Sequence, residues 1–181
     1  MQYKNKRSEL LEILKKIYAD AGMKFPFKER GTDVYEDICP FTVFGSFNKG
    51  ITDEHRVDLL KQFAKQFSIT AEIPTEFAGI PVVMNLSAWF FAYKGNRGEK
   101  DIDNLWELLD KAIAYSDEPS SENKNAFIGI YNQVIKQRGI KWNITMGLYW
   151  VRPYTFISLD STNRALMADV DNMPRHFTDV F

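Results

Sequence analysis

The run IPVVMNLSAWFFAY, residues 80–93, constrains the fold more than any other stretch of the sequence. It is almost continuously apolar. Runs of this kind are typical of strands that are buried on both faces of a sheet. We therefore expect a buried strand here.

Two shorter segments near the C-terminal end also predict strands. They cover roughly residues 143–151 and 154–159 and meet at Arg152-Pro153, where the proline removes a ladder donor and marks a turn or an edge. Alternate residues of a strand face opposite sides, so at least one set in the first segment belongs to the core. We expect these two strands to pair against the 80–93 strand.

Elsewhere, apolar residues recur at three- and four-residue steps, which predicts amphipathic helices. Capping residues and glycines mark their ends. One runs from Ser8 to Ala21 before Gly22, one follows Thr52, one opens at Asp101 or Asp103, and one follows Ser120 or Ser121 and ends before Gly139. Because helices and strands lack a regular βαβ order, we expect an α+β fold, with a mixed or antiparallel sheet packed with about four main helices. The domain should span residues 1–166, with 167–181 as a C-terminal extension or linker.

The net charge, the cysteine count and the lengths of the apolar runs limit the possible functions. The net charge is −1, so the chain lacks the strongly basic body of proteins that wrap long nucleic acids, and any such contact must be local. Cys39 is the only cysteine, which excludes an internal disulfide and a cysteine-based zinc cluster, and we expect its thiol to pack. No apolar run reaches about 18 residues and no secretion signal is recognisable, so we expect a cytoplasmic protein without membrane contact.

Motifs for catalysis are missing. The segment GNRGEK at 95–100 has the wrong spacing for a phosphate-binding loop and lacks a hydroxyl after Lys100. His55 and His176 do not form a metal-binding pair, and His55 is expected to be solvated. We therefore expect no catalytic residue, no metal and no cofactor. A metal held by Asp33, Glu36 or Asp37 is the remaining enzyme hypothesis.

The stretch KWNITMGLYWVRPYTFISLDSTNR, residues 141–164, combines aromatic and basic side chains. From residue 136 to 164 five basic residues stand against a single acid, Asp160. Aromatic rings stack on bases and cations pair with phosphates, so this pattern predicts a small surface that contacts nucleic acid. The candidate DNA-binding residues are Lys141, Tyr149, Trp150, Arg152, Tyr154, Asn163 and Arg164.

A structural interpretation of the same stretch remains open. The rings can belong to a strand pair in the core, with the cations at its rim. Asp160, Ser161 and Asn163 can form a helix cap, with Arg164 pairing with Asp160 or with a phosphate.

Four passages, in this order along the chain, resemble the region that precedes the motor domain in bacterial McrB-like AAA+ restriction proteins. They are PFTVFGSFNKGITDEHR at 40–56, GIPVVMN at 79–85, DIDNLWELLDKAI at 101–113, and the aromatic and basic stretch at 141–164. The resemblance covers nearly all of residues 4–166. It implies a reader of DNA targets in phage defence, sometimes of modified bases. It also implies an AAA+ motor that uses GTP or ATP with Mg, and a nuclease in a separate subunit. The resemblance does not imply that this chain recognises methylcytosine.

Two main hypotheses follow. In the first, the chain is a DNA-binding specificity module for duplex DNA, including modified DNA. In the second, the aromatic surface docks the AAA+ motor or a partner subunit without touching DNA.

Overall fold

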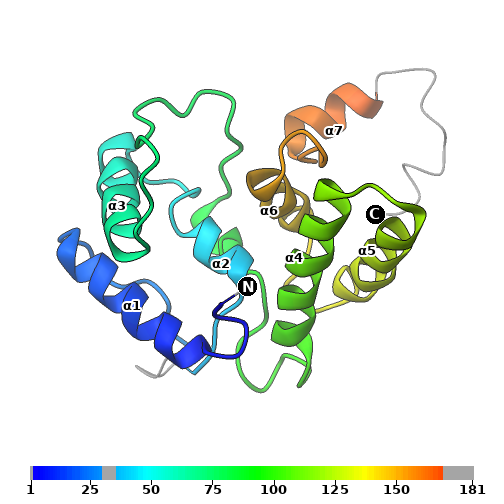
Figure 1. The fold of residues 1–181 in the computed structure, drawn as a ribbon, viewed down its shortest axis with the longest axis horizontal. Coiled ribbons are helices and arrows are strands. Elements are labelled where there is room, and N and C mark those ends of the chain that lie inside the picture. The colour runs from blue at the N-terminus through cyan, green and yellow to red at the C-terminus, as the bar shows by residue number, and fades with distance from the viewer. Residues whose placement is uncertain (1, 30–35, 169–181) are drawn as a thin grey trace.

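The computed structural model describes residues 2–29 and 36–168 (Figure 1). Helices account for 52% of the structure. The elements are α1 Arg7–Asp20, α2 Pro40–Gly45, α3 Asp53–Gln66, the short 3-10 helix η1 Asn85–Ser87, α4 Asp101–Asp117, α5 Ser121–Val134, α6 Asn143–Val151 and α7 Ser161–Ala168.

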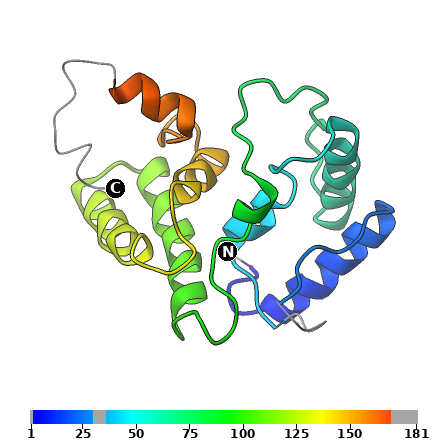
Figure 2. The same ribbon diagram turned by 180° about the vertical axis from the view of Figure 1, so that it is seen from behind.

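The helices fall into two groups with α2 between them (Figures 1 and 2). On one side α1 packs against α3, and on the other α4 packs against α5. The short helix α2 contacts α4 and α6. Its buried residues belong to one hydrophobic core that also contains residues of α1 and α3, so the two groups share a core. No helix in the described ranges has the length and hydropathy needed to cross a membrane.

Local capping chemistry sets several helix starts, as the sequence predicted. The Thr52 hydroxyl accepts a hydrogen bond from the His55 N–H at 3.2 Å, and the Ser120 hydroxyl accepts one from the Asn123 N–H at 3.1 Å. The first helix is confirmed, although it begins at Arg7 and Ser8 is not its cap. Gly22 follows that helix with a φ of +67°, a conformation that favours glycine.

The predicted strand at 80–93 is wrong, and with it the α+β fold. Within the described ranges the only β pairing is one isolated parallel bridge between Lys49 and Val83. Pro81 and the turn of η1 interrupt the run. Its aromatic end still enters the core, because Phe90 is fully buried. The backbone N–H of Phe90 donates a hydrogen bond to the Thr42 hydroxyl at 3.0 Å. A side chain therefore satisfies this buried donor, as the backbone of a neighbouring strand would in a sheet.

The two predicted C-terminal strands are also wrong. Residues 143–151 form α6, and 154–159 run as an irregular segment. Every residue of α6 from Asn143 to Leu148 is buried, so this helix lacks the polar face that would reveal a helical period. A Cβ on Gly147 would lie 2.7 Å from the Phe41 ring, so glycine allows α6 and α2 to pack closely.

The lone thiol packs in the interior, as expected. Cys39 is fully buried at the start of α2, and its sulfur accepts a hydrogen bond from the Thr42 N–H at 3.4 Å. Burial raises the pKa of the Cys39 thiol to about 12. The thiol is therefore a small apolar core group and not a nucleophile.

Candidate nucleic-acid interface

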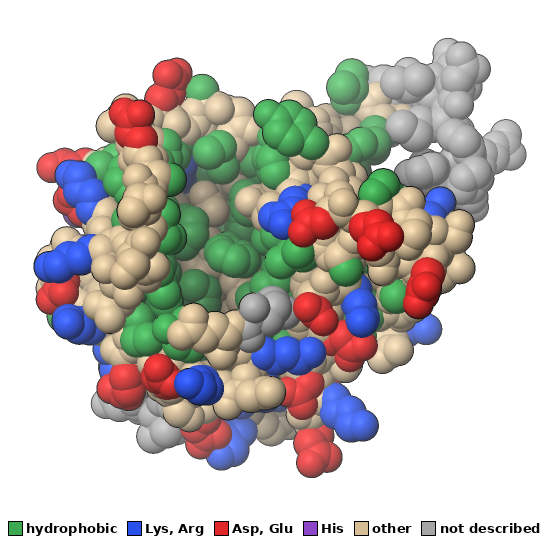
Figure 3. Space-filling view, viewed as in Figure 1, with side chains coloured by type: hydrophobic (Ala, Val, Ile, Leu, Met, Phe, Trp, Pro, Cys, Tyr) green, Lys and Arg blue, Asp and Glu red, His purple; other side chains and the backbone are tan. Residues whose placement is uncertain are grey.

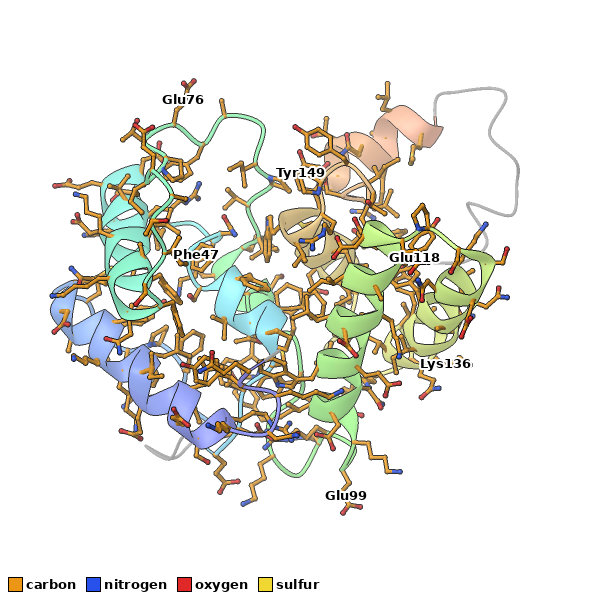
Figure 4. The ribbon with its side chains drawn as sticks, in the orientation of Figure 1. Phe47, Glu76, Glu99, Glu118, Lys136 and Tyr149 are labelled. Carbon is orange, nitrogen blue, oxygen red and sulfur yellow. The ribbon has the colours of Figure 1, made fainter. Side chains whose placement is uncertain are left out.

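Two concave regions open on the described surface. The first, which we call the apolar pocket, has a volume of about 430 Å³ and lies among α1, α2, α3 and residues 69–74. Figure 3 shows a hollow with hydrophobic side chains on its walls, and Figure 4 shows Phe47 between α2 and α3. Among its lining residues in the described ranges, only Glu72 is charged. This pocket therefore has almost nothing to orient a polar ligand.

The second region, which we call the aromatic–basic groove, has a volume of about 790 Å³. It lies between residues 82–93 on one side and the start of α6 with the start of α7 on the other. The 82–93 segment and α6 run next to each other in the view from behind (Figure 2). Among the described residues that line it, the charged ones are Arg138, Lys141, Arg164 and Asp160. The groove is therefore positively charged although the whole chain is not.

The arginines of the groove differ from the other arginines in the described part of the chain. Four arginines elsewhere have a carboxylate partner: Arg7 with Asp37 and Asp103, Arg56 with Asp53, Arg97 with Glu29, and Arg152 with Asp117. The remaining two of the described arginines, Arg138 and Arg164, have no carboxylate within 4.0 Å, and both line the groove. Their charges are available to an anion.

Arg164 is held by an aromatic ring. Its guanidinium carbon lies 4.5 Å from the centre of the Trp142 ring, and its Nε donates to the backbone oxygen of Asp160 at 3.4 Å. The Asp160 carboxylate instead accepts from the Asn163 N–H at 2.9 Å and caps α7. Arg164 is thus positioned without being neutralised.

The other two cations lie along the same groove. Arg138 is exposed and its Nη1 donates to the Asn96 side-chain oxygen at 2.9 Å. Lys141 is exposed next to Trp142. Positions 138 and 141 lie in the loop between α5 and α6, where Gly139 adopts a φ of +96°. A Cβ added to Gly139 would lie 3.1 Å from the Phe91 backbone. The loop needs glycine at 139 for this close contact.

Aromatic rings form the opposite wall. Trp89 contacts Phe91 with ring centres 4.8 Å apart and Tyr93 with centres 5.7 Å apart. Tyr93 is exposed at 38%, so much of its ring is accessible from the groove. Rings on one wall and cations on the other are the two components of a surface that binds single bases and their phosphates.

The predicted site residues divide into two sets. Lys141 and Arg164 line the groove, whereas Tyr149, Trp150, Arg152, Tyr154 and Asn163 do not. Trp150 is half-buried and donates from its indole N–H to the Pro81 oxygen at 2.8 Å. Arg152 binds Asp117 at 3.0 Å, and Asn163 donates to the Ser158 oxygen at 2.7 Å. These three side chains have structural partners.

Two of the aromatic residues that we predicted to contact DNA lie outside the groove. Tyr149 is half-buried on α6 (Figure 4), and Tyr154 is fully exposed in the turn that follows that helix. Sequence reasoning missed Tyr93, Trp89 and Arg138 as groove residues. Arg138 stood in the counted basic segment, but only the tertiary structure brings it to the 82–93 segment.

The hypothesis of a carboxylate-bound metal has little support in the described ranges. Asp33 lies outside them. Glu36 forms an ion pair with Lys94 at 2.6 Å, and Asp37 forms one with Arg7 at 3.2 Å. Burial raises the pKa of the Asp37 carboxyl, which disfavours its charged form. No group of three metal-binding side chains occurs among the residues that the structure describes. His55 is exposed, and His176 lies outside the described residues.

Comparison with known proteins gives a family but not an activity. The family model described as "Domain of unknown function (DUF8425)" matches residues 1–177. The chain belongs to this family. No curated protein and no solved structure matches the chain. The DUF8425 family carries no assigned role, so the function of this member has to be argued from its own surface.

Proposed function

We propose that this DUF8425 member is a DNA-binding specificity module that reads its target with the aromatic–basic groove. The observation that supports this most is the pairing pattern of the arginines. In the described part of the chain, the two without a carboxylate partner line the same groove, together with Lys141. Cations left unpaired on one concave surface attract a polyanion, and their effect is local because the chain as a whole carries a charge of −1.

Each component has a role in this proposal. Arg138, Lys141 and Arg164 contact phosphates, which fix the register of the DNA without reading its sequence. Tyr93 offers a ring for stacking a base, and Trp142 holds Arg164 in place. The groove has a volume of about 790 Å³, which leaves space for a base that has left the duplex stack. A modified base could be distinguished there by its shape and its hydrogen-bonding groups.

The biological setting that we propose follows the resemblance to McrB-like restriction proteins. In that setting the chain reads duplex DNA, including modified DNA. An AAA+ motor of the same protein uses GTP or ATP with Mg, and a separate subunit cuts. The chain itself then needs no catalytic residue and no cofactor.

The test is a binding titration on a panel of modified and unmodified duplexes, starting at about 50 mM salt, where phosphate contacts are strongest. In the double variant Arg138→Ala with Arg164→Ala, we expect the slope of log K against log salt to fall by about 2. Arg152→Ala is the matched control, because that arginine is already paired with Asp117 and lies outside the groove. Absence of binding to every duplex, or a double variant that binds like the wild type, would contradict the proposal.

A second candidate function is docking of the motor or of a partner subunit. It is favoured by the apolar pocket and by the exposed apolar side chains of Tyr154, Ile157 and Leu166 outside the groove. Co-purification with a neighbouring subunit that persists at high salt and ignores DNA would support docking. Loss of that complex in Tyr154→Ala would assign it to this surface.

A further inference from the structure

A row of apolar side chains lies on the rim of the aromatic–basic groove. Four alternate residues are exposed to solvent: Ile80, Val82, Met84 and Leu86. Val83, between them, is buried. The exposed fraction rises along the row to 76% for Met84 and 95% for Leu86. Single exposed apolar side chains are ordinary on a protein surface, but a row of four marks a contact site.

Hydrogen bonds hold this row in place. The Val83 N–H donates to the Asn48 oxygen at 3.0 Å, and the Trp150 indole donates to the Pro81 oxygen at 2.8 Å. Beyond Leu86, the Asn143 side chain donates to the Ser87 oxygen at 3.1 Å. Leu86 therefore projects from η1, a short turn that is fixed to α6 next to it. Trp150, a candidate for stacking on a base, donates to Pro81 at the other end of this row.

The position of the row limits what can cover it. Val82, Met84 and Leu86 line the same groove as Arg138, Lys141 and Arg164. An occupant must therefore offer negative charge to the cations and an apolar, flat surface to Leu86 at the same time. A base step of duplex DNA, with its phosphates on either side, has both properties. Charge complementarity thus favours DNA over an apolar protein surface.

We infer that Leu86, supported by Met84, is a wedge that enters a base step of duplex DNA and opens it for the groove. This inference rests on the proposed DNA-binding function. In DNA-binding proteins, apolar side chains such as Leu and Met insert between base pairs, unstack them and kink the duplex. A base that leaves the stack creates a gap, and a side chain that fills the gap offsets part of the cost of extrusion. The groove next to Leu86 then receives the displaced base.

The experiment uses duplexes that carry 2-aminopurine, whose fluorescence is quenched by stacking, at successive positions of a bound sequence. With the full chain, we expect the fluorescence to rise at one or two adjacent positions. In Leu86→Ala the rise should disappear, and affinity for the paired duplex should fall about tenfold because the unstacked state loses its support. Leu86→Met should retain most of the rise, since a flexible apolar side chain also fills the gap.

A matched control is Leu166→Ala, which removes another exposed leucine that does not line the groove. It should change neither the fluorescence nor the affinity. A duplex with a mismatch at the responsive position gives a second control. There the defect of Leu86→Ala should shrink, because the base pair is already weakened. Leu86 is almost fully exposed, so its truncation should leave the thermal midpoint unchanged.

The outcomes separate this inference from the proposed function. If the wild type binds DNA with a steep salt dependence but no 2-aminopurine position brightens, the wedge is wrong and the DNA-binding function stands. The same holds if Leu86→Ala brightens as the wild type does. If the wild type binds no duplex, the proposed function fails, and the wedge fails with it. If Leu86→Ala binds DNA normally but loses a neighbouring subunit, the row is a protein-docking surface instead.

Discussion

The apolar pocket and the aromatic–basic groove are both concave and both lined by aromatic rings, yet they differ in their charges. Among their described lining residues, the pocket has one charged side chain, Glu72, and the groove has four. The pocket is lined by α1, α2, α3 and α4 together with residues 69–74, whereas the groove lies between irregular segments and helix starts. Helices therefore supply much of the first region, whereas irregular segments and helix starts supply most of the second.

This difference shows where stability and recognition reside in the chain. Side chains of the pocket also belong to the hydrophobic core, so changing them alters the fold. The cations of the groove contact few structural partners, so changing them should alter binding and leave the fold intact. Function is often placed on loops that a rigid scaffold positions. The comparison can be tested by variants that act on one region and spare the other.

The largest effect is expected in the pocket. Phe63 is 8% exposed, and its ring centre lies 5.2 Å from that of Phe47 and 6.0 Å from that of Phe67. Phe63→Ala should lower the free energy of unfolding by about 3 kcal/mol, because it leaves a cavity among packed rings. Denaturant titration measures this loss. Arg138→Ala should change stability by less than about 0.5 kcal/mol. Equal effects of the two variants would remove the distinction between the regions.

Charge reversal in the groove should give the next largest effect. Lys141→Glu with Arg164→Glu should weaken binding to duplex DNA about 100-fold at roughly 0.1 M salt, because two attractive contacts become repulsive. Fluorescence anisotropy measures the change. Lys65→Glu with Lys124→Glu is the matched control, since it changes the net charge equally at exposed lysines outside the groove. If both double variants weaken binding alike, total charge matters and the groove does not.

A smaller effect is expected from one ring of the groove. Tyr93→Ala should weaken DNA binding about tenfold, in line with the loss of one stacked base, while Tyr93→Phe should bind nearly as the wild type does. Tyr154→Ala serves as the comparison, because that ring is fully exposed but outside the groove. A larger loss in Tyr154→Ala than in Tyr93→Ala would move the stacking surface to the turn after α6.

The smallest change should be the response of the apolar pocket to salt. An uncharged fluorescent dye such as Nile red should bind there with an affinity that varies less than about twofold between roughly 50 and 500 mM salt, because no charge pair is screened. Phe47→Ala should weaken the dye signal, and Arg164→Ala should not. A dye signal that follows Arg164 would place the dye in the groove and leave the pocket without an apolar ligand.

Local chemistry allowed part of the fold to be predicted. The helix starts at Thr52 and Ser120 depend on a hydroxyl and on N–H groups a few residues away, and both were found in the structure. The apolar runs were harder to assign to helix or strand. In residues 143–151 a helix that is buried on nearly all sides looks like a strand, because the period of burial is hidden when every position is buried.

The candidate site was predictable only in part for a similar reason. The sequence identified the basic and aromatic segment, and Lys141 and Arg164 do line the groove. It could not show that Asp117 pairs with Arg152 across 35 positions, or that Trp150 reaches Pro81 across 69. Whether an arginine is neutralised depends on which carboxylate the packing brings near it.

The sequence by itself determined the helix starts at Thr52 and Ser120, that the lone thiol is apolar in character, and which segment is rich in cations. The tertiary structure decided that the longest apolar run is an irregular segment and not a strand, and which cations keep their charge unpaired. The physical reason is the distance along the sequence over which each interaction acts. Capping and periodicity act over a few residues, whereas burial and ion pairing depend on groups that only the packed chain brings together.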